Sequence, residues 1–444
     1  MELNRRRFLI ASGGATAGLM LGLSSRAQEQ TCASGLPFVI TVQASGAWDP
    51  TFLVDPVADN ADFTPFTAAQ IASAGELRYA PFIDADGVVS PYLVGDDQQD
   101  FFAKHAARTL VFNGVDNRTV SHDVGPRVAF TGSTRDGQPT LSGLAAGLQG
   151  GDMPLAMFVS SGFASTGGLV PVTRGGSLDL LRTVADPNRD STHPEAVNGL
   201  LQAAIEARDV RLLEGGSLPR LRRAYETIRE ARSGALEQRF EEIAEVLDNA
   251  SSGNRGLAAT AAGVLALMSS GATAAAHLSL GGFDTHDSHD DDHPGALSNL
   301  LETLNFIVDS AAADAALSER GVVVVVASDF GRTRYNGEGG KDHWPITSMM
   351  AMGVGAAESR LRGGRVIGAT TPTGGNGVEA LPVRVDGGSA TVTEADDPDG
   401  FYLTPGHVHH ALREAIGICD SGAPEDPVGR FALNVIPNQP IPLS

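Results

Sequence analysis

The stretch GVVVVVASDFGRTRYNGEGGKDH, residues 321–343, decides the fold. It begins with five consecutive valines, Val322 to Val326, and no polar residue interrupts them. Such a run of β-branched residues is typical of a strand buried on both faces of a parallel sheet. Asp329 and Gly331 follow just after this strand, where open α/β sheets bind their ligands. The stretch therefore predicts an α/β fold with a functional site at this strand end.

Other patterns extend this prediction along the chain. Apolar runs predict further strands at residues 36–43, 108–113, 154–160, 273–280 and 349–353. Helical patterns occupy residues 99–108, 257–268, 296–315 and 408–416. Strands separated by helices indicate a mostly parallel central sheet with helices on both faces. We expect a single domain over residues 28–444, with a helical insertion at about 186–256 and a small β region at about 363–400.

The first 27 residues predict an export leader. NRRRFLI, residues 4–10, resembles the twin-arginine consensus, and small residues at 25–27 offer a cleavage site. The apolar run between them is too short and too rich in glycine to span a bilayer well, which favours a cleaved leader over a membrane anchor. We expect a periplasmic or secreted protein that is exported by the twin-arginine translocase and has no stable membrane anchor.

Charge and cysteine content narrow the function classes. The 444 residues carry a net charge of -21, which argues against nucleic acids and anionic membrane surfaces as partners. The two cysteines, Cys32 and Cys419, could pair in an oxidising compartment or remain two inert thiols. Neither stands in a spacing typical of metal sites.

Acidic residues follow three of the predicted strands. Asp49 comes after the strand at 36–43, Asp284 after that at 273–280, and Asp329 after the valines. The carboxyl ends of parallel strands lie at one edge of a sheet, so these groups can converge. Converging carboxylates repel each other unless a cation or protons intervene, which favours a bound divalent metal. The alternative is that one or more of these acids cap the helices that follow them.

Imidazoles accompany these acids. His286 lies two residues after Asp284, and His343 lies in a predicted Gly-rich loop beside Asp342. Imidazole with carboxylate suits a transition ion, whereas carboxylates alone would also suit Ca²⁺ or Mg²⁺. The neighbouring acidic run and its histidine, residues 290–293, are interpreted as a solvated acidic loop.

Several motifs resemble those of one family. GGFDTH (281–286), SDFGRT (328–333) and GGKDH (339–343) resemble the signatures GGWDTH, SEFGRT and GTDHG of the exported "domain of unknown function" family numbered 1501. SHDVGPRVAFTG (121–132) is similar to the family's SHF…TG segment. The resemblance implies an alkaline phosphatase-like fold within the alkaline phosphatase/sulfatase superfamily, with metal ligands at the strand ends. The candidate ligands are Asp49, Asp284, His286, Asp329, Asp342 and His343.

The same resemblance implies hydrolysis of a phosphate or sulfate ester, with a small anionic ester as substrate and Zn, Ca, Mg or Mn as the metal. The superfamily's nucleophile stands at a helix N-terminus after the second strand, where this chain has Ser121. Thr51 is a weaker choice, and a metal-bound water is the alternative attacking group. His122 is a further candidate catalytic residue. Arg127, Arg332 and Lys341 are the candidate hydrogen-bond donors to the oxyanion.

The chain also departs from the superfamily's patterns. Phe330 stands where the sulfatase-like motif has a metal ligand, and a phenyl ring cannot bind a metal, which argues against a full two-metal site. Trp344 replaces the glycine of the family's DHG. No C-x-P-x-R motif is present, which excludes a formylglycine sulfatase. A non-catalytic periplasmic binding or assembly protein that keeps the fold and a partial metal site is the alternative function.

Overall fold

The computed structural model describes most of the chain beyond the predicted leader. The described residues are 35–80, 83–84, 87–88, 92–95, 97–151, 153, 155–175, 195–214, 222, 257–386, 389–418, 431, 433 and 441–443. Residues 32–444 form one compact unit, divided from residues 1–31. The predicted leader, both cysteines and most of the predicted insertion lie outside the described residues. None of the helices described is long and apolar enough to cross a membrane.

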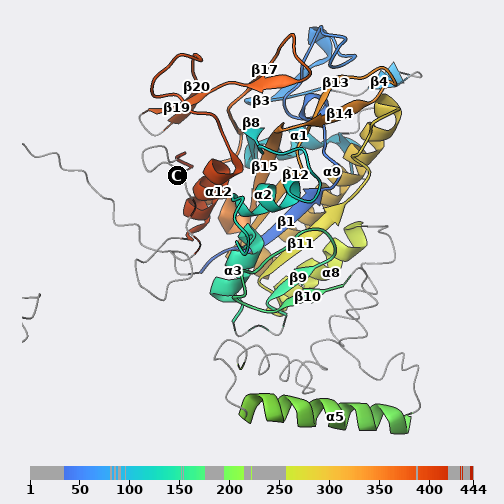
Figure 1. Cartoon of the computed structure of the whole chain (residues 1–444), viewed down its shortest axis with the longest axis vertical. Coiled ribbons are helices and arrows are strands. Elements are labelled where there is room, and N and C mark those ends of the chain that lie inside the picture. The colour runs from blue at the N-terminus through green and yellow to red at the C-terminus, as the bar shows by residue number, and fades with distance from the viewer. Residues whose placement is uncertain are drawn as a thin grey trace, which may run out of the picture. The chain divides into compact units, whose positions relative to one another are not determined.

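The central sheet has eight strands in the order β10-β9-β11-β1-β12-β15-β8-β16 (Figure 1). Their bounds are β1 Phe38–Ala44, β8 Thr109–Asp116, β9 Met157–Val159, β10 Val172–Arg174, β11 Ala275–Leu280, β12 Val322–Ser328, β15 Ile346–Val354 and β16 Arg365–Ile367. Only β15 runs antiparallel to its neighbours, which are β12 and β8, and the other pairings are parallel. The predicted α/β class with a mostly parallel sheet is confirmed.

The valine run forms β12 at the middle of this sheet, and all seven residues of the strand are buried. Val322, Val324 and Val326 pack into the core on one face, whereas Val323 and Val325 pack into the core on the other. Both faces are therefore apolar, as the unbroken run predicts. Because β12 pairs in parallel with β1, and β1 with β11, these three strands end at the same edge of the sheet.

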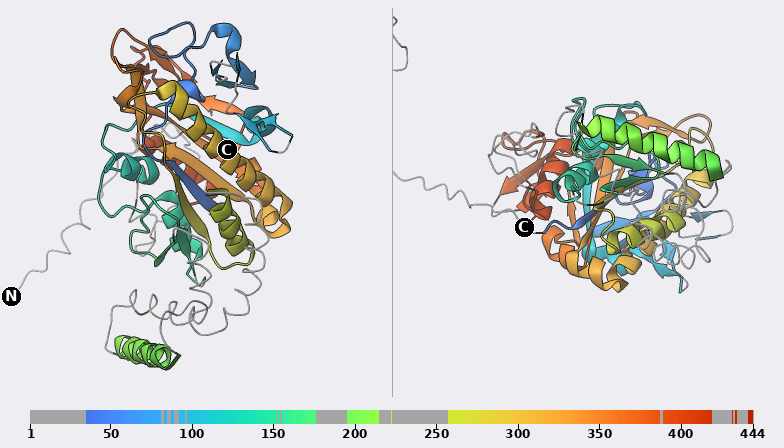
Figure 2. Two further views of the ribbon diagram at one scale, coloured as in Figure 1. Left: turned by 90° about the vertical axis from the view of Figure 1, so that its right-hand side faces the viewer. Right: turned by 90° about the horizontal axis from the view of Figure 1, so that it is seen from below.

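Helices cover both faces (Figures 1 and 2). Apolar residues of α8 and α9 belong to the core on one face, and those of α2, α3 and α12 to the core on the other. The bounds of these helices are α2 Gly125–Thr131, α3 Leu141–Gln149, α8 Leu257–Ser269, α9 His289–Ala313 and α12 Pro405–Ile416.

Helix α9 begins earlier than the sequence predicted. The acidic run interpreted as a solvated loop forms its first turns, and His293 within that run is fully buried. The reason is a buried stripe at helical spacing, in which His289 and His293 continue into Leu297 and Leu300. The prediction of a loop at residues 290–293 is therefore wrong, and the prediction of solvation is wrong for His293.

The predicted Gly-rich loop is the turn of a β-hairpin, β13 (Gly331–Tyr335) with β14 (Lys341–Trp344). The Asn336 side-chain oxygen accepts hydrogen bonds from the backbone N–H groups of Glu338 and Gly340, which closes the turn. The segment predicted as loop at Asp342 and His343 is thus a strand. This gives both side chains a fixed direction.

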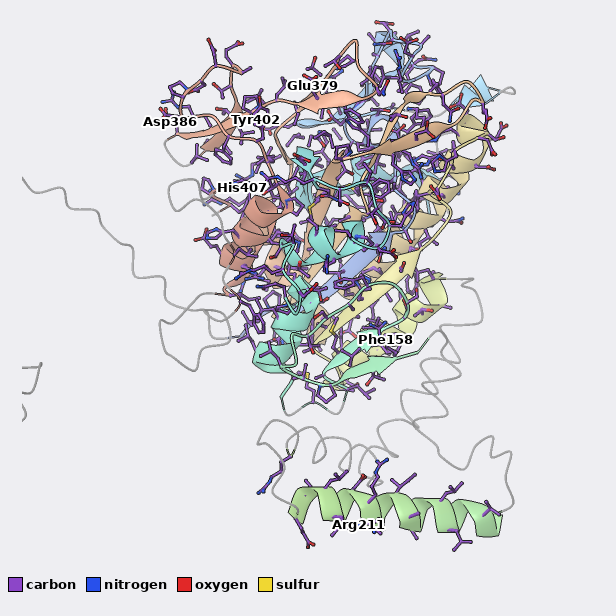
Figure 3. The ribbon with its side chains drawn as sticks, viewed as in Figure 1. Phe158, Arg211, Glu379, Asp386, Tyr402 and His407 are labelled. Carbon is purple, nitrogen blue, oxygen red and sulfur yellow. The ribbon has the colours of Figure 1, made fainter. Side chains whose placement is uncertain are left out.

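The remaining elements surround this core. They are α1 Phe101–His105, α5 Glu195–Glu214, α10 Ala315–Arg320, α11 Glu358–Leu361, η1 Pro50–Phe52, η2 Ala68–Gln70, η3 Ala106–Arg108, η4 Gly355–Ala357, β2 Ala72–Ala74, β3 Leu77–Tyr79, β4 Ile83–Asp84, β5 Gly87–Val88, β6 Leu93–Val94, β7 Gln99–Asp100, β17 Thr370–Pro372, β18 Val378–Ala380, β19 Val383–Asp386 and β20 Ser389–Val392. The hairpins β17–β18 and β19–β20 lie within the stretch predicted as a small β region. Figure 3 shows Glu379 and Asp386 on these hairpins and His407 in the first turn of α12.

A buried histidine joins α12 to α2. His409 donates from Nε2 to the Ala129 carbonyl at 2.7 Å, and its Nδ1 has no partner among the described residues. Burial lowers the pKa of His409 to about 4. In the unfolded chain, this histidine binds a proton with the ordinary pKa of about 6.5. The free energy of unfolding therefore decreases as the pH falls from about 6.5 towards about 4.

We predict that His409→Gln makes the protein less sensitive to acid. Gln keeps an N–H for Ala129 but does not titrate, so the variant should lose about 2 kcal/mol less free energy of unfolding than the parent between pH 7 and pH 5. Urea unfolding at both pH values measures this. His410→Gln, on the same helix but only half-buried, is the control, and equal pH slopes in parent and His409→Gln would contradict the prediction.

Candidate metal centre

Four side chains meet beyond the carboxyl ends of the sheet strands. His122 comes from the loop between β8 and α2, Asp284 and His286 from the loop between β11 and α9, and His343 from β14. The Nε2 atom of His343 lies 3.2 Å from Nε2 of His122 and 2.9 Å from Nε2 of His286. Oδ1 of Asp284 lies 3.6, 3.1 and 3.4 Å from the Nε2 atoms of His122, His286 and His343. We call these four residues the His₃Asp cluster.

Each imidazole of the cluster is oriented from behind through Nδ1. His122 faces Oδ2 of Asp329 at 2.8 Å, His286 faces Oδ1 of Asp342 at 2.8 Å, and His343 faces the Val120 carbonyl at 3.0 Å. The carbonyl can only accept, so Nδ1 of His343 carries the proton. Carboxylates are acceptors too, which assigns the same tautomer to the other two rings. All three Nε2 atoms therefore carry a lone pair that can bind a metal.

That arrangement suits a metal ion. Ligands about 2.0–2.1 Å from a tetrahedral ion lie about 3.3 Å from each other. The donor atoms of His122, Asp284 and His343 all lie within 4.8 Å of one another, and Nε2 of His286 lies 2.9 Å from that of His343 and 3.1 Å from Oδ1 of Asp284. Lone pairs and a carboxylate at such distances repel each other unless positive charge lies between them. Histidines backed by carboxylates or carbonyls are also the usual arrangement at metal sites.

The centre is partly open to solvent. The four side chains are between 25% and 48% exposed. The buried ring of Phe330 packs beneath His122 and His343, with centroids 4.8 and 4.5 Å away. Phe330 thus lies under the rings at a position where the sulfatase-like motif has a ligand.

Charge and burial favour the metal-binding forms of Asp284 and His343. Burial alone would raise the pKa of Asp284, but the hydrogen bond and charge of Arg332, with His122 and His286, hold it below its usual value. Burial, and then the charge of Arg332, lower the pKa of His343. A deprotonated carboxylate and a neutral imidazole are the forms that bind metals.

Two close backbone approaches bring the loops together. At Gly340, in the hairpin turn, an added Cβ would lie 1.8 Å from the His286 carbonyl oxygen. At Gly46, an added Cβ would lie 2.6 Å from the Asp284 backbone nitrogen, and Gly46 has φ of 111°. Only glycine leaves space for these contacts, so His286 and His343 reach each other because residue 340 has no side chain.

A second, fully buried polar cluster lies behind the first. Lys341 donates from Nζ to Oδ2 of Asp49 at 2.5 Å, and both side chains are 0% exposed. Lys341 also donates to the Phe63 carbonyl and to Oγ1 of Thr51. Nε2 of His289 lies 3.2 Å from the same Asp49 oxygen. We call Asp49, Lys341, His289 and His293 the buried ion-pair cluster.

The electrostatics of this cluster are those of an internal ion pair. Burial alone would raise the pKa of Asp49, but the charge of Lys341 and then the hydrogen bond to His289 bring it well below the usual range. Burial lowers the pKa of His289 and of His293, so both rings stay neutral. His293 accepts the backbone N–H of Asp49 at 3.0 Å through Nε2. The Lys341 ammonium thus supplies the positive charge that Asp49 needs.

The structure places the six candidate ligands in three different settings. Asp284, His286 and His343 belong to the His₃Asp cluster itself. Asp329 and Asp342 stand one step behind it, against the Nδ1 atoms of His122 and His286. Asp49 is the anion of the buried ion-pair cluster.

The candidate catalytic residues are also divided. His122 lies in the cluster, and the exposed Ser121 directly precedes it. The Ser121 carbonyl accepts a hydrogen bond from the Gly125 N–H and so closes a turn. Arg332 is buried and donates to the carbonyls of Gly46, Ala47, Lys341 and Phe283 as well as to Asp284. The guanidinium of Arg127 pairs with Asp136.

Four residues that build this region were not predicted as functional from the sequence. Gln43 and Gly46 donate to the two oxygens of Asp329, at 2.9 and 3.1 Å, and so fix the carboxylate that orients His122. His289 and His293 were missed because the acidic run beside them was interpreted as a loop and not as the start of a helix. Their spacing of four residues, continued by Leu297, was the available signal. No signal in the sequence marks Gln43.

Comparisons with known proteins give a family for part of the chain. Residues 264–395 match the family described as "Protein of unknown function (DUF1501)". No curated protein matches the chain. Alkaline phosphatase from the Antarctic bacterium TAB5 is similar, with 11% identity, a TM-score of 0.33, and coverage of 74% of this chain and 94% of that chain.

A second solved structure is similar over a larger part of this chain. "Ps i-CgsB in complex with k-i-k-neocarrahexaose" has 9% identity, a TM-score of 0.33, and coverage of 90% of this chain and 77% of that chain. The family match contains the motifs GGFDTH, SDFGRT and GGKDH, from which the family was predicted. The likeness to the DUF1501 family of proteins of unknown function therefore extends over residues 264–395.

Proposed function

We propose that the His₃Asp cluster binds one transition ion of the zinc class, and that the protein uses it to hydrolyse a phosphate or sulfate ester. The observation that carries the proposal is the convergence of Nε2 of His122, Nε2 of His343 and Oδ1 of Asp284 within 4.8 Å of one another, with Nε2 of His286 only 2.9 Å from that of His343. Three imidazoles favour Zn²⁺ or a similar ion over Ca²⁺ and Mg²⁺, which prefer oxygen ligands.

The chain's own residues divide the work. His122, His343 and Asp284 bind the ion with His286 as an adjoining donor, while Asp329, Asp342 and the Val120 carbonyl hold the three rings in place. A Lewis-acidic ion would polarise an ester oxygen and lower the pKa of an attacking hydroxyl. Ser121, exposed beside His122, is the chain's candidate for that hydroxyl, and water is the alternative.

The partial exposure of all four donors supports catalysis, because a substrate can approach the centre from solvent. One observation favours the second candidate function, a metal-binding protein without turnover. Nε2 of His286 lies next to the group formed by His122, Asp284 and His343, and if it binds too, four protein donors complete a tetrahedral zinc site, as in structural sites, whereas catalytic sites keep a position for water or substrate. The experiments below separate the two.

Export is part of the proposal. The arginine-rich start of the chain supports transport of the folded protein by the twin-arginine translocase, which would place it in the periplasm or outside the cell. A small anionic ester is then the proposed substrate.

We predict that the protein binds about one Zn²⁺ per chain and that His343→Ala weakens this binding about 100-fold or more. The variant removes the ring that touches both other imidazoles. Zinc titration against a chelating indicator measures the affinity. His410→Ala, a histidine of α12 outside the cluster, should bind zinc like the parent. Unchanged zinc affinity in His343→Ala would refute the proposed ligand set.

We predict that zinc-loaded protein hydrolyses at least one member of a panel of phosphate and sulfate monoesters, and that His343→Ala does not. If Ser121 attacks, Ser121→Ala loses turnover while its zinc affinity stays the same; if water attacks, Ser121→Ala retains turnover. Zinc bound with no turnover on the whole panel would exclude the hydrolase on those substrates and favour the non-catalytic function.

We predict that Gly340→Ala weakens zinc binding by at least about tenfold, because its Cβ must push the His286 backbone away and so separate two ligands. Gly337→Ala is the matched control, since it lies in the same turn and its added Cβ meets no atom within 4 Å. Equal zinc affinities in the two variants would show that this close approach does not position the cluster.

A further inference from the structure

A cavity of about 480 Å³ lies beside the His₃Asp cluster. Its walls are the loop after β11, at Gly281, Gly282 and Asp284, and the first turns of α9. Asp284 therefore belongs to both the cluster and the cavity wall. A volume of this size is typical of small-molecule sites.

The residues of α9 that line the cavity lie on one face of the helix. Asp292, Gly295 and Asn299 follow each other at intervals of three and four residues, so they lie on the same side of the helix. Asp292 and Asn299 are exposed, and an added Cβ at Gly295 meets no atom within 4 Å. The wall thus offers a carboxylate and an amide with open space between them.

The charge of the cavity selects its occupant. Neither lysine nor arginine is among its described lining residues, and Asp292 adds a negative charge. Asp284 is already paired with Arg332. A second anionic group in the ligand would meet like charge without a cation, which disfavours it. Hydroxyl groups, in contrast, can donate to Asp292 and exchange hydrogen bonds with Asn299.

We propose that this cavity is the subsite for the alcohol part of the ester, and that it takes a hydroxyl-rich, uncharged group such as a polyol or a sugar ring. This rests on the proposed function, because the ester group itself would lie at the His₃Asp cluster. The cavity would then set the choice of substrate, while the cluster performs the chemistry. A carboxylate on the same alcohol is rejected by Asp292.

Calorimetric binding to zinc-loaded protein tests this without turnover. Glucose 6-phosphate and 6-phosphogluconate are the main probes, and they differ in one carboxylate and in ring against open chain. Sorbitol 6-phosphate, an open chain without the carboxylate, is the matched control for 6-phosphogluconate and should bind like glucose 6-phosphate. We expect glucose 6-phosphate to bind about tenfold more tightly than inorganic phosphate or 6-phosphogluconate, as a few added hydrogen bonds allow. Tighter binding of phosphoethanolamine than of glucose 6-phosphate would overturn the assignment to hydroxyl groups.

Two variants locate the effect in the cavity. Gly295→Leu fills it and favours the helix, so the advantage of glucose 6-phosphate should vanish while zinc and inorganic phosphate bind as before. Asp292→Asn should reduce the difference in affinity between glucose 6-phosphate and 6-phosphogluconate several-fold. Gly374→Leu, at an exposed glycine whose added Cβ meets no atom within 4 Å, is the control and should match the parent.

The outcomes separate this inference from the proposed function. The subsite alone would be overturned if inorganic phosphate binds but glucose 6-phosphate binds no more tightly. It would also be overturned if Gly295→Leu leaves the affinity for glucose 6-phosphate unchanged. Zinc-loaded protein that binds no phosphate at all would overturn the proposed function and the subsite with it.

Discussion

The ion pair between Lys341 and Asp49 is the constraint on which the site depends. Lys341 belongs to the hairpin that carries His343, and Asp49 follows the central strand β1, so the pair fixes the hairpin to the sheet. Both charges are removed from water, and each needs the other: losing one partner of such a pair typically costs about 3–5 kcal/mol. The hairpin therefore has one strongly preferred position, and His343 is held where the other imidazoles can meet it.

The short motifs connect this buried pair to the exposed cluster. In GGKDH, Lys341 faces the interior while Asp342 and His343 serve the cluster. In GGFDTH, Asp284 and His286 face the cluster while the hydroxyl of Thr285 contacts Nδ1 of the buried His289 at 2.6 Å. Each motif thus joins an interior contact to an outer donor. This explains why residues of such different burial stand next to each other in the sequence.

Much of the fold could be predicted from patterns that depend on local sequence alone. The valine run of β12 and the apolar runs of β1, β8 and β11 were sufficient, because burial on both faces leaves no polar residue in a strand. The direction of β15 was not predictable, since an apolar run looks the same in either orientation. The position of α9 was obscured by its acidic first turn.

The site was predictable as a set of residue types but not as a geometry. The sequence placed Asp329 and Asp284 after strand ends, and it could not say which of them points at the centre. That depends on the partners of each carboxylate: Gln43 and Gly46 hold Asp329 behind His122, and Arg332 holds Asp284 in front. These partners lie far away in the chain. His122 likewise comes next to His343 only through the tertiary fold.

The position of β1 has a consequence for synthesis of the chain. Its two neighbours, β11 and β12, begin at Ala275 and Val322, so both edges of β1 stay without partners while residues 45–274 are made. At about 5–20 residues per second, that interval lasts about 10–50 s. During this time FVITVQA is an apolar strand with free backbone groups on both sides, which is prone to aggregation. A nascent chain of this protein therefore needs shielding of this strand until β11 and β12 have left the ribosome.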